Sequence, residues 1–118
     1  MTIRREQWTK LEVSVTVEAP RTTLRLGTLF VSPGGMFLPN EMAVDPYTPV
    51  TVRFSVENRA IVAHAEVRRI LSPQEVQDRG INIKASGTEL RIIRMEGDGS
   101  HILAEHIKKV LMESGGPT

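Results

Sequence analysis

Apolar and polar residues alternate along most of the first 96 residues of the chain. Between Leu11 and Glu18 the odd positions are apolar and the even positions are polar, which is the pattern of a β-strand with one buried face. A shift by one residue would bury Glu12 and Glu18, so the pattern determines which face points inward. The alternation returns between Leu24 and Phe30, and we expect both segments to be strands.

A bend and a hairpin follow. Ser32-Pro33-Gly34-Gly35 predicts a turn, because proline fixes φ and the two glycines are free to adopt positive φ. Met36-Phe37-Leu38 then predicts a short strand. The segments Val50–Val56 and Ile61–Val67 alternate again, and the tight link around Asn58-Arg59 between them predicts a β-hairpin.

The pattern changes twice beyond the hairpin. Ser72-Pro73-Gln74-Glu75 has the order of a helix capping box, with serine as the N-cap, proline at the first helical position and glutamate at the third. Ile81–Ala85 and Glu89–Met95 predict two further strands. After Ser100 the apolar residues recur at helical spacing, which predicts one amphipathic helix that ends at Gly115-Gly116-Pro117. Its apolar positions are Leu103, Ile107, Val110 and Leu111.

Together these elements favour an all-β fold, a small barrel or curled sheet of roughly six short strands with a C-terminal helix. A length of 118 residues fits one such domain. We expect a flexible basic segment at residues 1–10, the barrel at residues 11–96, and the helix with its tail at residues 97–118.

Composition narrows the functional classes. The chain has no cysteine, which excludes disulfides, thiolate metal sites and cysteine nucleophiles. Its net charge of +1 and its few aromatic residues argue against a DNA- or RNA-binding barrel. No apolar run approaches the roughly 18 residues of a membrane helix, and the N-terminus lacks the apolar core of a signal peptide. We therefore expect no membrane insertion, with the cytoplasm as the default location.

Catalytic and metal motifs are missing from the sequence, so we expect neither an enzyme nor a cofactor. His101 and His106 resemble an inverted zinc-protease motif, but their spacing is one residue too long. Side chains five positions apart point about 140° away from each other on a helix, so we expect no zinc site there. Six arginines form either an anion-attracting face or an ordinary charged surface paired with Glu12, Glu18 and Glu66, and the second interpretation is the better supported. These arginines are Arg21, Arg25, Arg68, Arg69, Arg91 and Arg94.

The stretch from Leu29 to Leu38 resembles the second signature segment of PilZ domains, which reads Asp/Asn-x-Ser-x-x-Gly and precedes an apolar strand. Ser32 and Gly35 match this pattern, whereas Phe30 stands where the Asp or Asn is expected. The order of the following elements also fits, so the resemblance covers roughly residues 4 to 85. It implies a six-stranded antiparallel barrel of the split-barrel type that binds the bacterial second messenger cyclic di-GMP.

In PilZ domains an N-terminal Arg-x-x-x-Arg loop wraps the phosphates and guanines of the ligand. Here Arg4 and Arg5 precede the first strand, but the matching second positions are Trp8 and Thr9, and Lys10 is the nearest basic replacement. Trp8 is either a stacking platform for a guanine or a partly buried anchor. The resemblance thus gives as candidate cyclic di-GMP contacts Arg4, Arg5, Lys10, Ser32 and Gly35.

Two functions follow from the resemblance. Some divergent PilZ-like proteins lack both signatures and act as protein adaptors, and Phe30 with the Gly-Gly-Met-Phe sequence resembles that subset. The first hypothesis is therefore an adaptor in cyclic di-GMP-linked regulation, with weak or absent nucleotide binding. The alternative is a functional receptor in which Arg4, Arg5, Lys10 and Ser32 form a variant clamp. We expect the protein partner to bind the exposed faces of Met36-Phe37-Leu38 and the C-terminal helix.

Overall fold

The computed structural model describes residues 7–114, which form one antiparallel sheet of eight strands and two helices. The strands are β1 (Thr9–Leu11), β2 (Val15–Ala19), β3 (Thr22–Leu26), β4 (Leu29–Val31), β5 (Gly35–Leu38), β6 (Pro49–Val56), β7 (Arg59–Leu71) and β8 (Gly87–Met95). The helices are α1 (Pro73–Asp78) and α2 (Gly99–Ser114). Strand order in the sheet is β1-β4-β5-β8-β7-β6-β2-β3. The predicted all-β class with a C-terminal helix is confirmed, although the sheet has eight short strands rather than six.

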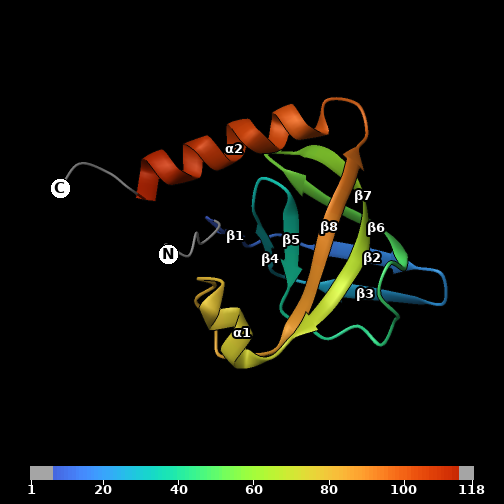
Figure 1. The fold of residues 1–118 in the computed structure, drawn as a ribbon. Helices are drawn as coiled ribbons and strands as arrows, with labels where there is room; N and C mark the ends of the chain where they lie inside the picture. Colours follow the sequence, from blue (N-terminus) through green and yellow to red (C-terminus); the bar gives the residue numbers. More distant parts are fainter. Residues whose placement is uncertain (1–6, 115–118) are drawn as a thin grey trace.

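The sheet curls into an incompletely closed barrel. β1 lies at one edge and β2 lies next to the other edge, yet only residues 12–14 join them. A link of this length spans at most about 14 Å, so the two ends of the sheet must approach each other. Figure 1 shows the curl, with α2 along one end and α1 at the other. The single strand predicted from Leu11 to Glu18 is therefore divided, although Leu11, Val15 and Val17 are buried as predicted.

The strand predicted from Leu24 to Phe30 is also two strands. β3 forms a hairpin with β2, whereas β4 pairs with β1 and β5. The chain leaves one pairing partner for the other at Gly27 and Thr28. The inward positions change at this corner from Leu24 and Leu26 to Leu29 and Val31, so Phe30 faces the opposite side of the sheet. Treating residues 24–30 as one alternating strand therefore missed the change of partner.

The β6–β7 hairpin is confirmed. Its turn places Glu57 and Asn58 at φ values of 50° and 64°, which suits the twist of a two-residue hairpin. The capping box is also confirmed, since the Ser72 hydroxyl accepts from the Glu75 N–H and the Glu75 carboxylate accepts from the Ser72 N–H. The strand predicted at Ile81–Ala85 is wrong. That segment is irregular because Ile81 turns back beneath α1, where its N–H donates to the carbonyl of Val76.

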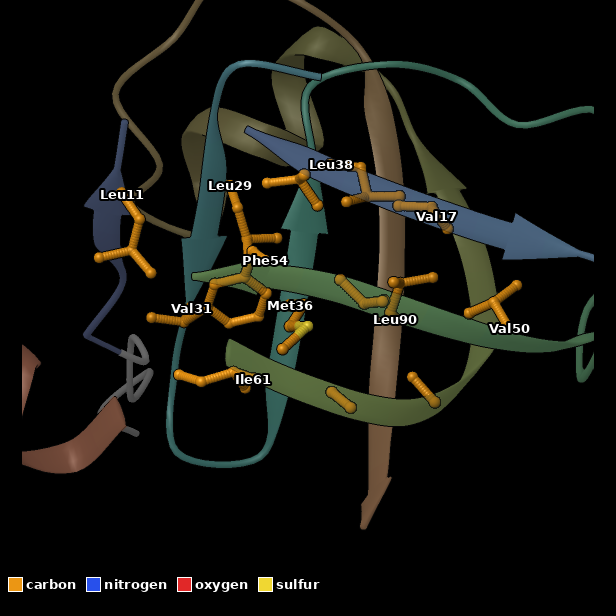
Figure 2. Close-up of a cluster of buried hydrophobic side chains, with 14 of the residues drawn as sticks. Leu11, Val17, Leu29, Val31, Met36, Leu38, Val50, Phe54, Ile61 and Leu90 are labelled. Carbon is orange, nitrogen blue, oxygen red and sulfur yellow. The ribbon is translucent and has the colours of Figure 1, made fainter. Parts of the chain in front are cut away.

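Two apolar clusters stabilise the fold. The barrel core fills the interior, and Figure 2 shows its side chains converging from both halves of the sheet. The outer cluster lies on the opposite face of β4 and β5, between the sheet and α1. Its buried members are Phe30, Phe37, Leu71, Val76 and Ile81, with Trp8 and Ile83 packed against them.

The expectation that Met36-Phe37-Leu38 is exposed is wrong, because all three residues are fully buried. Met36 and Leu38 point into the barrel core, and Phe37 points into the outer cluster. β5 is thus buried on both faces and offers no partner surface.

α2 packs over β6 and β7 with Leu103 buried in the barrel core. Its polar residues face outward as predicted. Glu57 anchors the helix, since its carboxylate lies 2.8 Å from Lys109 Nζ and 3.0 Å from His106 Nδ1. The predicted helix end at Gly115-Gly116-Pro117 lies outside the described residues. Neither helix within residues 7–114 has the length and apolar character of a membrane span.

Candidate functional site

The bend between β4 and β5 carries the signature-like segment. The Ser32 N–H donates to the Gly35 carbonyl at 3.0 Å, and the Gly35 N–H donates back to the Ser32 carbonyl at 3.4 Å. The Ser32 hydroxyl also lies 3.5 Å from the Gly35 carbonyl oxygen. Ser32 is only 8% exposed, whereas Pro33 and Gly34 form the exposed tip. The serine therefore faces the turn and its surroundings rather than projecting into solvent.

Close packing explains Gly35 of the bend, whereas a Cβ on Gly34 would meet open space. Gly34 and Gly35 both have negative φ, so the expectation that they provide positive φ is wrong. A Cβ on Gly35 would lie 3.0 Å from the Leu90 carbonyl oxygen on β8 and 3.6 Å from the Trp8 ring. A side chain here would push β8 or Trp8 away, which explains the glycine without a ligand.

Phe30 occupies the position of the missing Asp or Asn. It is 5% exposed, and its ring meets Phe37 edge-on with centroids 5.9 Å apart. Val76 from α1 and Leu71 from β7 complete its surroundings in the outer cluster. The position that carries a polar group in the signature thus holds the sheet and α1 together.

Of the candidate cyclic di-GMP contacts in the N-terminal segment, Arg4 and Arg5 lie outside the described residues. Lys10 lies directly opposite Phe30 in the β1–β4 ladder, so it is brought near the bend. Its ammonium is exposed and pairs with Glu12 at 3.3 Å. Trp8 is half-buried against the outer cluster, and its indole N–H is buried without a hydrogen-bond partner among residues 7–114. Trp8 thus lies in the position of an anchor.

A hollow of about 220 Å³ opens beside the bend on the side of Trp8 and Gly34. Three guanidinium groups line it, those of Arg68, Arg79 and Arg91. Sequence reasoning missed Arg79, because only the return of the chain through α1 brings it to this place.

The charges of the hollow are mostly paired. Arg91 lies 3.2 Å from Glu66, as the charged-surface interpretation predicted. The buried carboxylate of Glu89 accepts from Arg79 and Arg69. Arg68 is the lining arginine that pairs with no carboxylate of the described chain.

Two of the predicted ion pairs form with other partners, and no metal site forms among residues 7–114. Glu12 and Glu18 pair with Lys10 and Arg53 rather than with the six arginines considered from the sequence. Within residues 7–114 no group of three His, Asp or Glu side chains is arranged to hold a metal ion.

The curled antiparallel sheet, its glycine-containing bend and the covering C-terminal helix define a small, incompletely closed β-barrel domain. The sequence matches the family described as PilZ domain over residues 2–96, and the chain belongs to this family. The resemblance seen in the bend is thereby confirmed, and the module is linked to cyclic di-GMP, which is a ligand of the family rather than a cofactor.

A solved structure shows the same fold. The Bacillus subtilis inhibitor of motility (MotI/DgrA) is similar with a TM-score of 0.66 at 16% sequence identity. The similarity covers 94% of this chain and 53% of that one, so the chain spans about half the length of that protein. No curated protein matches the sequence.

Proposed function

We propose that the chain is a non-enzymatic protein-interaction adaptor in bacterial cyclic di-GMP-linked regulation that binds the nucleotide weakly or not at all. The burial of Phe30 carries this proposal. A carboxylate or carboxamide at this position would offer hydrogen bonds to a guanine, whereas a phenyl ring offers none. The ring is also committed to the outer cluster beneath α1, so it does not swing aside without exposing that cluster.

The basic segment before β1 also lacks one contact of the family's Arg-x-x-x-Arg loop. A second arginine would bind phosphate or a guanine edge through two parallel hydrogen bonds, while Lys10 supplies only a flexible point charge. Each bidentate contact is worth about 1–3 kcal/mol. Losing one at the leader and one at Phe30 therefore weakens binding by about two orders of magnitude or more.

Trp8 does not offset this loss. Stacking on a guanine would be worth about 1–3 kcal/mol, but the Trp8 ring already lies against Gly35 and the outer cluster. Using it as a platform would first require its release from that packing. The net gain is then small.

Isothermal titration calorimetry of the chain with cyclic di-GMP tests the proposal. We expect no saturable heat at submicromolar nucleotide. Submicromolar binding that Arg5→Ala and Ser32→Ala abolish, and that Arg21→Ala on the β2–β3 turn leaves unchanged, would contradict the adaptor assignment.

The hollow beside the bend favours a second candidate, a cyclic di-GMP receptor with a variant clamp. Its lining holds Arg68 free of carboxylates of the described chain, close to the bend that carries Ser32 and Gly35. If this receptor exists, nucleotide must raise the melting temperature, because it binds the native state. Arg68→Ala would then reduce the rise, whereas Arg25→Ala on the remote β3 edge would not. An unchanged melting temperature at high nucleotide concentration excludes this candidate.

A further inference from the structure

A β-bulge places Arg68 in the wall of the hollow beside the bend. In the β7–β8 ladder Val67 lies opposite Leu90 and Arg69 lies opposite Glu89, so Arg68 has no partner residue on β8. Such an extra residue changes the face to which the following side chain points. Arg68 and Arg69 therefore both lie on the outer face, where Arg68 lines the hollow and Arg69 contacts Glu89. Without the bulge one of the two side chains would point into the barrel.

The buried carboxylate beside Arg68 is already neutralised. Only 5% of the Glu89 side chain is exposed, and a charge buried to this degree has to be paired. Arg69 and Arg79 both donate to it, and Glu75 on α1 adds a second negative charge near these two arginines. Glu89 therefore needs no contribution from Arg68.

One positive charge is left over in the hollow. The fourth arginine, Arg91, pairs with Glu66 at 3.2 Å. Four arginines thus face three glutamates, and Arg68 is the arginine that pairs with no carboxylate among residues 7–114. A guanidinium is a planar fork that binds a carboxylate through two parallel hydrogen bonds. The hollow can therefore accept one further carboxylate without breaking an existing ion pair.

The size of the hollow favours a single side chain over a nucleotide. Pockets that hold small-molecule ligands typically have volumes of about 300–1,000 Å³, whereas this hollow has a volume of about 220 Å³. Cyclic di-GMP carries two guanines, so most of the molecule would lie outside the hollow. A glutamate or aspartate side chain fits inside and carries the charge that Arg68 lacks.

We propose that the hollow binds a glutamate or aspartate side chain from an acidic segment of the adaptor's protein partner, and that Arg68 pairs with this carboxylate. The inference rests on the proposed function, because an adaptor requires a surface for another protein. Trp8 lines the hollow and is the single tryptophan of the chain. Its fluorescence and its indole N–H resonance therefore report on this place alone.

Titration of the full chain with an end-blocked tetraglutamate peptide tests the proposal, with Trp8 as the reporter and tetraglutamine as the uncharged probe. We expect a saturable response to tetraglutamate and none to tetraglutamine. Arg68→Ala should raise the dissociation constant about fivefold, which is the upper range for an exposed ion pair. Arg25→Ala removes the same charge from β3, at the far end of the strand order, and should leave the constant unchanged.

A second pair of variants should strengthen binding, a result that loss of folding does not imitate. Glu66→Gln releases Arg91 from its ion pair at the hollow and should lower the dissociation constant about twofold. Glu18→Gln makes the same change in net charge but releases Arg53 on β6 instead. It should have no effect on the dissociation constant.

The outcomes separate this proposal from the adaptor assignment. No saturable response to tetraglutamate, or a response that Arg68→Ala leaves unchanged, would overturn the proposal and leave the adaptor assignment standing. Inorganic phosphate that binds as tightly as the peptide would also overturn it, because the hollow would then be a general anion site. A saturable Trp8 response to submicromolar cyclic di-GMP would overturn both.

Discussion

Replacing Phe30 with alanine tests whether this position is structural. The ring is 5% exposed and touches Phe37 at a centroid distance of 5.9 Å. Truncating a buried phenylalanine costs about 3–5 kcal/mol, from lost transfer energy and from the cavity that remains. The edge-on aromatic contact places Phe30 in the upper part of this range, because such pairs contribute about 0.5–1.5 kcal/mol beyond burial. We therefore expect a loss of about 4–5 kcal/mol in the free energy of unfolding.

Urea unfolding measures this loss as a lower midpoint at unchanged m-value. Tyr47→Ala is the matched aromatic control, since Tyr47 is 78% exposed and its truncation should stay within about 0.5 kcal/mol. A cost below about 1 kcal/mol for Phe30→Ala would mean that the ring is not held beneath α1. The argument that this position is unavailable to a guanine would then fail.

Three further changes test the surrounding structure. Gly87→Ala should cost about 3 kcal/mol or more in a denaturant titration, because a Cβ there would overlap β5, whereas Gly27→Ala, with open space around it, should be nearly neutral. Hydrogen bonds from Lys109 and His106 lower the pKa of the Glu57 carboxyl, so its stabilisation is present above about pH 4.5 and is lost as the pH falls further. Melting temperatures against pH should therefore fall more steeply for the wild type than for Glu57→Gln in that acidic range, and parallel profiles would contradict this. Ser72→Ala should cost about 1 kcal/mol in thermal unfolding through loss of the α1 cap.

The sequence correctly predicted the elements that are determined by residues close together along the chain. The capping box from Ser72 to Glu75 and the β6–β7 hairpin depend on neighbouring residues, and both form as predicted. The amphipathic helix after Ser100 forms for the same reason. Alternation likewise identified the inward residues of β2 and β6.

Changes of strand partner were beyond this reasoning. Nothing in the alternating pattern marks residues 12–14 as the place where the chain crosses to another part of the sheet. At Gly27 the inward positions do change, from Leu26 to Leu29, but we predicted one continuous strand there. Apolar and polar residues alternate at Ile81–Ala85 as in a strand, because burial of Ile81 beneath a short helix requires the same residue type as burial in a sheet.

The candidate site was likewise predicted only in part from the sequence. The sequence located the bend and the substitution at Phe30, but only the structure shows that the ring enters a second cluster between β4 and α1. Met36, Phe37 and Leu38 were expected to be exposed although three consecutive apolar residues are typical of a strand buried on both faces, as the structure shows. Arg79 reaches the hollow through the path of α1, which the sequence pattern does not reveal.

Backbone amide chemical shifts during a cyclic di-GMP titration test the central claim most directly. If the buried phenyl ring and the turn-bound serine exclude the nucleotide, the amides of Lys10, Ser32 and Gly35 should keep their shifts or drift without saturation. Saturable shifts confined to these three amides would show that the nucleotide occupies the bend, and the adaptor assignment would have to be abandoned.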